Sequence, residues 1–229
     1  AYLVGTQGVW RLLTAFGPLL SSLHARNELA ELEIWVGRLL KILGIASVLA
    51  AALVYALSAV LVTRVLGPGF NPVTPLLPIL ALAGLAIAPS GVARILAVTY
   101  KEPAASITGA ALQLAAFLGF GMLLIPRIGS RGACWVVVIS VTLFAAYSTW
   151  HMRRLLPYSL NRWLQVMGLG ALLSPLLWAV PANPILKSCA FSAAFLAALT
   201  LFRIAGPRDL QALRLAFGRR SIAPIAGIA

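Results

Sequence analysis

The sequence predicts an all-α membrane protein, a polytopic helix bundle with about seven transmembrane helices. Hydrophobic residues make up 61% of the 229 residues and charged residues only 10%, and the mean hydropathy is +0.97. A soluble domain usually carries about 25% charged residues. We predict a transmembrane bundle over 1–203 and a basic cytoplasmic tail over 204–229. The apolar runs long enough to cross a bilayer core are 2–20, 39–62, 73–100, 104–125, 133–150, 163–180 and 184–202.

The segments that flank the first two runs carry local signals for where helices begin and end. No initiating Met and no signal-peptide pattern precede the run at 2–20, so we expect further chain upstream. Residues 27–38 carry acids early and bases late, the order that a helix dipole favours. They predict a helical extension leading into the run at 39–62. The Gly-Pro-Gly-Phe-Asn-Pro stretch at 67–72 predicts a helix stop followed by a turn.

The runs 104–125 and 133–150 form the clearest unit in the sequence. Only six residues lie between Pro126 and the second run, so the two helices must be antiparallel neighbours. Small residues spaced four apart let another helix backbone approach closely in lipid. The first of these helices carries three of them on one face: Ala111, Ala115 and Gly119.

Basic residues near the ends of the runs predict the topology, because cytoplasmic loops carry an excess of Lys and Arg. Thirteen fall on one side: Arg26, Arg38, Lys41, Arg94, Lys101, Arg153, Arg154, Arg162, Arg203, Arg208, Arg214, Arg219 and Arg220. Four fall on the other: Arg64, Arg127, Arg131 and Lys187. We therefore expect the first side and the C-terminus to be cytoplasmic. Anionic lipids are the expected partners of this charge, and nucleic acid is not expected.

A charge in the middle of a span costs roughly 2.5–3.5 kcal/mol on insertion scales and therefore suggests function. Arg11 lies near the centre of the first run, with Gln7 and Thr14 on the same helix face. We predict that this polar stripe binds an anionic group of a substrate. The alternative is a structural arginine satisfied by backbone carbonyls.

Two further polar residues and one kink complete the predicted site. Arg94 lies close to the cytoplasmic end of its run, so it either binds substrate or extends its side chain to the interface. Gln113 either forms an interhelical hydrogen bond or lines the cavity. Pro89-Ser90-Gly91 predicts a kink, since a proline within a span removes a backbone hydrogen bond. We expect Pro89 and Gly91 to form a hinge.

Catalysis is not expected from these residues. Hydrolases and transferases need an acid, a base or a metal near the chemistry, but His24 and His151 are isolated at the cytoplasmic edge. All five acidic residues fall outside the runs, and no His, Cys or carboxylate cluster has ligand spacing. The sequence therefore predicts no metal or other cofactor, and it predicts that Cys134 and Cys189 are buried free thiols.

Several short motifs, in order along the chain, resemble those of the polysaccharide flippases. Residues 123–133 read LLIPRIGSRGA and are similar to the LIP-x-x-G-x-x-GA hairpin of that family. Residues 17–23 (GPLLSSL) resemble its P-x-x-S-x-x span end, and residues 65–70 (VLGPGF) resemble its LFG-x-x-F span end. The run LLPILALAGL at 76–85 also matches the family.

This resemblance implies a transporter of usually 12–14 helices in two lobes, of which this chain supplies most of the second lobe and two final helices. The missing N-terminal lobe of the same chain would be its partner. The implied activity is flipping of a polyprenyl-diphosphate-linked oligosaccharide across the bacterial inner membrane by alternating access. Arg11, with Arg94, would hold the diphosphate by charge-assisted hydrogen bonds. Another exporter of the same superfamily (for a drug or lipid II) and a non-transporting membrane scaffold or enzyme subunit remain alternatives.

Overall fold

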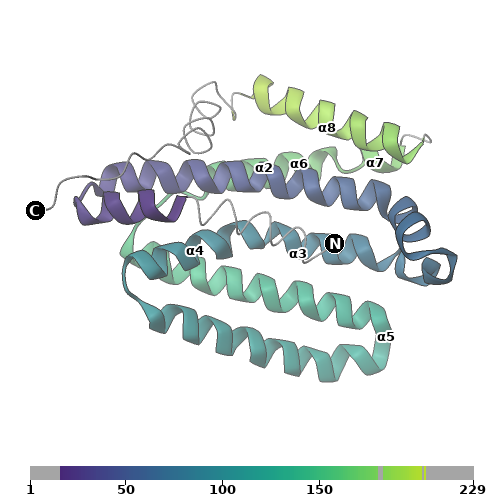
Figure 1. Ribbon diagram of the computed structural model, residues 1–229, viewed down its shortest axis with the longest axis horizontal. Coiled ribbons are helices and arrows are strands. Elements are labelled where there is room, and N and C mark those ends of the chain that lie inside the picture. Colours follow the sequence, from purple (N-terminus) through teal and green to yellow (C-terminus); the bar gives the residue numbers. More distant parts are fainter. Residues whose placement is uncertain (1–15, 180–182, 203, 205–229) are drawn as a thin grey trace, which may run out of the picture.

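The computed structural model describes residues 16–179, 183–202 and 204, and these contain helices and no strand (Figure 1). The predicted all-α class is confirmed. Residues 16–25 are helical. The elements that follow are α2 (Leu29–Leu61), a π-helical turn η1 (Val62–Leu66), a 3₁₀ segment η2 (Pro68–Val73), α3 (Leu76–Leu85), α4 (Ile87–Thr99), α5 (Pro103–Leu155), α6 (Asn161–Leu173), α7 (Leu176–Ala179) and α8 (Pro184–Leu201).

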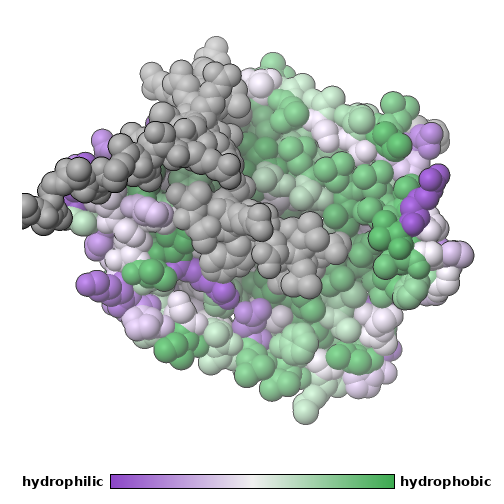
Figure 2. Space-filling view, in the orientation of Figure 1, coloured by the Kyte–Doolittle hydropathy of each residue, from purple (hydrophilic) through white to green (hydrophobic). Residues whose placement is uncertain are grey.

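Within the described residues, four helices are long and apolar enough to cross a membrane: Leu29–Leu66, Leu76–Thr99, Pro103–Leu155 and Pro184–Leu201. Their outward side chains are largely apolar, and Met122, for example, is 81% exposed. Apolar residues cover much of the face shown in Figure 2, and hydrophilic residues gather toward its two ends. Such a surface is stable in contact with lipid, so the chain has the character of a membrane protein.

The start of α2 agrees with the sequence. The predicted extension over 27–38 is helical from Leu29 onward and continues without interruption into the apolar part of α2. The predicted stop is also observed. The π-helical turn η1 ends at Gly67, whose φ of 92° is open to glycine but unfavourable for other residues.

The long helix α5 is a hairpin of two arms, 103–128 and 130–155, as Figure 1 shows. The predicted antiparallel pair is therefore confirmed. We expected a turn over 127–132, but the helices extend into it and leave only Gly129 outside helical geometry, with φ 59° and ψ −135°. Gly132 then packs on the opposite arm: a Cβ there would lie 2.7 Å from the carbonyl carbon of Leu124.

The face of small residues that was predicted to let another helix approach closely is not where the arms touch. Ala111, Ala115 and Gly119 are exposed in the structure. Contact is made instead through Gly109, where a Cβ would lie 2.8 Å from Cε2 of Phe144. A hydrogen bond of 2.6 Å between the hydroxyls of Thr108 and Tyr147 lies beside this contact.

The helices are arranged in layers that follow one another from top to bottom in Figure 1. α8 lies on one side, followed by α2 with α6, then α3 with α4, and finally the α5 hairpin. One buried cluster joins α2, α4 and the end of α5, and it includes Leu32, Val36, Leu40, Leu96 and Met152. A second joins α2, α6 and α8, and it includes Val48, Val166, Phe191 and Phe195.

A buried lysine connects two of these layers. Lys41 lies inside α2 and is only 9% exposed. Its Nζ donates a hydrogen bond of 3.1 Å to the carbonyl oxygen of Ile204, just beyond the end of α8. A cation is favourable there, because the last carbonyls of a helix carry partial negative charge.

Candidate functional site

The residues predicted to bind substrate fall in different places. Gln7, Arg11 and Thr14 lie outside the described residues, as does the basic tail apart from Ile204. Gln113 is half-buried on the first arm of α5. The described part of the predicted site is thus carried by α4 and α5.

Arg94 lies in α4 and is exposed, with its guanidinium carbon 4.7 Å from the ring centroid of Phe144. Phe144 itself is buried at 3% exposure. A cation over an aromatic face is attracted by the ring quadrupole. The ring therefore positions the Arg94 guanidinium between α4 and the second arm of α5.

The predicted kink is an interruption of one residue between α3 and α4, which together form one candidate span. α3 ends at Leu85 and α4 begins at Ile87, with Ala86 between them. Pro89 has no N–H to donate to the Leu85 carbonyl, so the helical ladder lacks one hydrogen bond at this point. Gly91 is buried one turn into α4. The break is thus observed, and a hinge motion about it stays a prediction.

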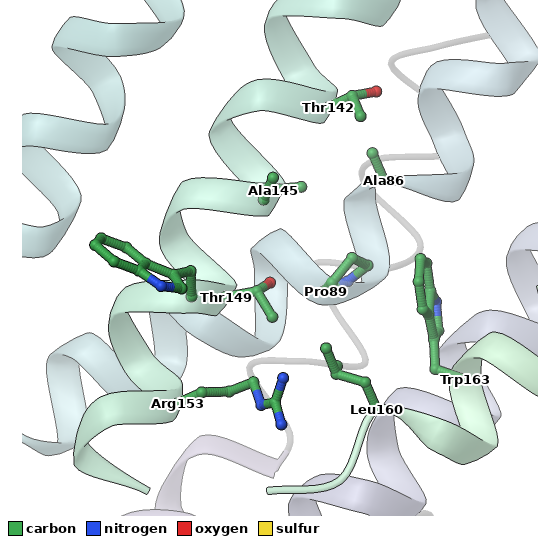
Figure 3. A pocket seen from close by; sticks show the side chains of 10 residues that line it. Ala86, Pro89, Thr142, Ala145, Thr149, Arg153, Leu160 and Trp163 are labelled. Atoms are coloured by element: carbon green, nitrogen blue, oxygen red, sulfur yellow. The ribbon is translucent and has the colours of Figure 1, made fainter. Parts of the chain in front are cut away.

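A pocket of about 280 Å³ lies directly beside this break (Figure 3). Three elements form it: the junction of α3 and α4, the second arm of α5 and the beginning of α6. Its lining residues are Ala86, Pro89, Thr142, Ala145, Ala146, Thr149, Trp150, Arg153, Leu160 and Trp163. Of the predicted site residues only Pro89 belongs to this set, whereas Arg94, Gln113 and Gly91 do not line the pocket.

Thr149 and Arg153 lie toward one end of the pocket, and Thr142, whose hydroxyl donates to the Val138 carbonyl, lies at the other. Figure 3 shows the side chains of Thr149 and Arg153 extending from α5 toward Pro89 and Leu160. Thr149 is 7% exposed, and its hydroxyl has no hydrogen-bond partner. Burial raises the pKa of nearby Tyr158 to about 12, so its hydroxyl stays protonated and donates to the Thr149 carbonyl, 3.5 Å away.

Trp163 forms the opposite wall of the pocket and packs on α2. Glycine at position 44 gives the indole room, since a Cβ there would lie 2.9 Å from Cδ1 of Trp163. The indole N–H is buried and has no hydrogen-bond partner. This packing places an aromatic wall across the pocket from Thr149 and Arg153 (Figure 3).

This pocket was not predicted from the sequence, because Arg153 was used only to count charge and Trp163 was not connected with it. One local signal was present. Thr142, Thr149 and Arg153 follow at intervals of seven and four residues, which places them on one helix face. The facing walls come from α4 and α6, and sequence spacing alone does not bring these together.

Among the described residues, no group of three or more His, Cys, Asp or Glu side chains is arranged to hold a metal ion. Comparisons with protein-family models, with curated proteins and with solved structures find no match for this chain. The proposed function therefore rests on the residues of this chain and on the motifs that they form.

Proposed function

We propose that this chain is part of a flippase that moves a polyprenyl-diphosphate-linked oligosaccharide across the bacterial inner membrane. The observation that carries the proposal is the geometry of the α5 hairpin. Each glycine of the flippase-like motif has a separate role there. Gly129 adopts φ 59°, and Gly132 lies against the backbone of the opposite arm. The resemblance therefore falls on residues that the hairpin needs, which supports a shared fold.

The charge distribution also supports an anionic substrate. The glutamates among the described residues lie at helix ends, with Glu28, Glu31 and Glu33 at the start of α2 and Glu102 just before α5. Cation-coupled drug export would favour an acidic group inside a span. The basic residues, in contrast, include Arg94 within α4. This contrast favours the phosphate-bearing substrate over a cationic drug.

In the proposed mechanism, Arg11 binds the diphosphate, with Gln7 and Thr14 beside it. Arg94 contributes a second cation from α4. Guanidinium groups suit this task because they form paired, charge-assisted hydrogen bonds with phosphate oxygens. The two lobes of the complete protein rock about this site, and the break before Pro89 and Gly91 lets α3 and α4 change their angle.

The test is the substitution Arg11→Gln in the complete protein, assayed by export of lipid-linked oligosaccharide in cells. We expect export to fall about tenfold or more, because hydrogen bonds to a charged group contribute about 1.5–3 kcal/mol. The amount of protein in the membrane should not change. Arg162→Gln is the matched control, since Arg162 is exposed at the start of α6.

Normal export by the Arg11→Gln protein would remove Arg11 from the site. A scaffold or enzyme subunit predicts a different result. In that case export would be unaffected, but assembly with a partner protein would be disturbed.

A further inference from the structure

We propose that the pocket between α4, the second arm of α5 and α6 binds a phosphate-bearing lipid. Arg153 holds the headgroup, and the small apolar side chains of the pocket hold the beginning of the lipid chain. This site goes beyond the proposed transport function, because a lipid can occupy it whether or not the protein moves a substrate.

The shape of the pocket is the first argument. Thr142 and Arg153 line its two ends along α5 and are eleven residues apart, which corresponds to about 16 Å of helix. Ala146 and Trp150 lie between them, and both are exposed. The pocket is therefore long and open along one side, and an extended chain can enter it sideways.

The division of polarity is the second argument. Arg153 lies at one end of the pocket, near the end of α5. Toward the other end the walls are formed by small apolar residues, Ala86, Ala145 and Ala146, and by Thr142, whose hydroxyl is already bonded to the Val138 carbonyl of its own helix. A ligand that satisfies both ends has an anionic group on an apolar chain.

The chemistry of Arg153 is the third argument. Within the described part of the chain, no carboxylate forms an ion pair with this exposed guanidinium. Guanidinium matches phosphate oxygens in pairs. Thr149 supplies a second polar group, because its hydroxyl is more than nine-tenths buried and has no hydrogen-bond partner. In Figure 3 both side chains extend toward the space bounded by Pro89 and Leu160.

The aromatic residues indicate the depth of the site. Trp150 is half-exposed, and the guanidinium carbon of Arg154 lies 3.7 Å from its ring centroid. Trp163 lies on the other side of the pocket. Indole rings prefer the level of the lipid headgroups. Arg153 therefore lies where a lipid phosphate is found.

The ligand can come from two sources with the same chemistry, a glycerophospholipid or a polyprenyl phosphate. Pockets for small molecules usually measure about 300–1,000 Å³. A pocket of about 280 Å³ is slightly smaller than this range. It therefore accommodates a headgroup and the first part of one chain, while the rest of the lipid stays in the bilayer.

The experiment is a lipid titration of the purified chain in detergent, followed by native mass spectrometry. The probes are dioleoylphosphatidylglycerol, farnesyl phosphate and inorganic phosphate. Arg153→Gln should weaken binding of the first two about tenfold. Arg162→Gln makes the same change of charge at a nearby exposed arginine that does not line the pocket, and it should bind as the unsubstituted chain does.

A second pair of variants tests the apolar half of the site. Ala146→Leu places a larger side chain in the pocket and should also lower lipid binding severalfold, whereas Ala111→Leu, on an exposed face of the first arm, should not. Preference for one of the two lipids identifies the source of the ligand. Unchanged binding in both Arg153→Gln and Ala146→Leu would overturn the proposal. The proposal would also be overturned if inorganic phosphate bound as tightly as the lipids, because the hydrocarbon chain of the lipid would then contribute nothing to binding.

Discussion

Single residues decide the geometry of the α5 hairpin. Gly129 reverses the chain with one residue of positive φ, and Gly132 lets the arms meet immediately afterwards. The sequence predicted a reversal here from Pro126 and the short spacing between the runs. It did not predict how tight the reversal is, because helix ends depend on contacts that form only after the arms have paired.

The close contact at Gly132 leads to a prediction about stability. Gly132→Ala should lower the free energy of unfolding by about 1–3 kcal/mol, because the added methyl group would overlap backbone atoms of Leu124 that cannot rotate away. Gly119→Ala is the matched control on the same hairpin. Nothing lies within 4 Å of a Cβ at position 119, so this variant should be as stable as the parent or more so. Thermal unfolding in detergent measures both, and equal stability of the two variants would contradict the close approach.

The arginines show the limit of prediction at the residue scale. Arg94 was predicted to bind substrate or to extend to the interface, and it packs over Phe144 without lining the pocket. Arg153 was assigned to the interface, yet it lines the pocket. The spacing of residues gives the face on which a side chain lies, but the rotation of each helix against its neighbours decides what that face meets.

At the scale of elements, breaks in the helices are the most informative feature. α3 and α4 each carry a proline at the third position, Pro78 and Pro89 respectively. Pro78 follows a non-helical segment and interrupts nothing, whereas Pro89 separates two helices that would otherwise join. The predicted run at 163–180 is divided in a similar way, since α6 ends at Leu173 and α7 begins at Leu176, on either side of Pro175.

Removing the proline should join the two helices. Pro89→Ala restores the N–H that can bond to the Leu85 carbonyl, and we expect α3 and α4 to straighten into one helix. Spin labels at Leu82 and Val98, which are both exposed, measure this distance. The labelled chain carries Ser in place of Cys189, which was predicted to be buried but is exposed. The backbone separation of the two labelled positions should approach about 24 Å, the rise of sixteen helical residues.

Pro78→Ala is the matched control and should leave this distance unchanged. Export by the complete protein should fall in Pro89→Ala if the break acts as a hinge. A straightened helix with normal export would show that the break is structural only.

At the scale of the whole molecule, the described residues keep polar groups toward the ends of the bundle and apolar groups between them (Figure 2). The fold class and the α5 hairpin could be predicted because they depend on composition and on local spacing. The layer order, the contact face of the first arm and the pocket could not, because they depend on packing between helices that are distant in sequence. Ala111, Ala115 and Gly119 illustrate this, since their spacing was read correctly but their face is exposed.

The topology prediction also belongs to the whole molecule. Fusion of alkaline phosphatase to the C-terminus should give an inactive enzyme in a bacterial host, and fusion of green fluorescent protein there should fluoresce, because both report a cytoplasmic end. Fusions after Gly129 should give the opposite results, since three predicted apolar runs, an odd number, separate the hairpin turn from the C-terminus. Active phosphatase at the C-terminus would contradict the orientation inferred from the basic residues.

The contact between Lys41 and Ile204 has a consequence for biosynthesis. The two residues are 163 positions apart, and α8 is synthesised long after α2. At about 5–20 residues per second, the ribosome needs roughly 8–33 s to reach Ile204 after it has made Lys41. During this interval the buried ammonium group lacks that carbonyl, and a hydrogen bond to a charged group contributes about 1.5–3 kcal/mol. In a nascent chain arrested before α8, α2 should therefore be held less firmly in the bilayer. Integration of α2 is completed only when α8 has been synthesised.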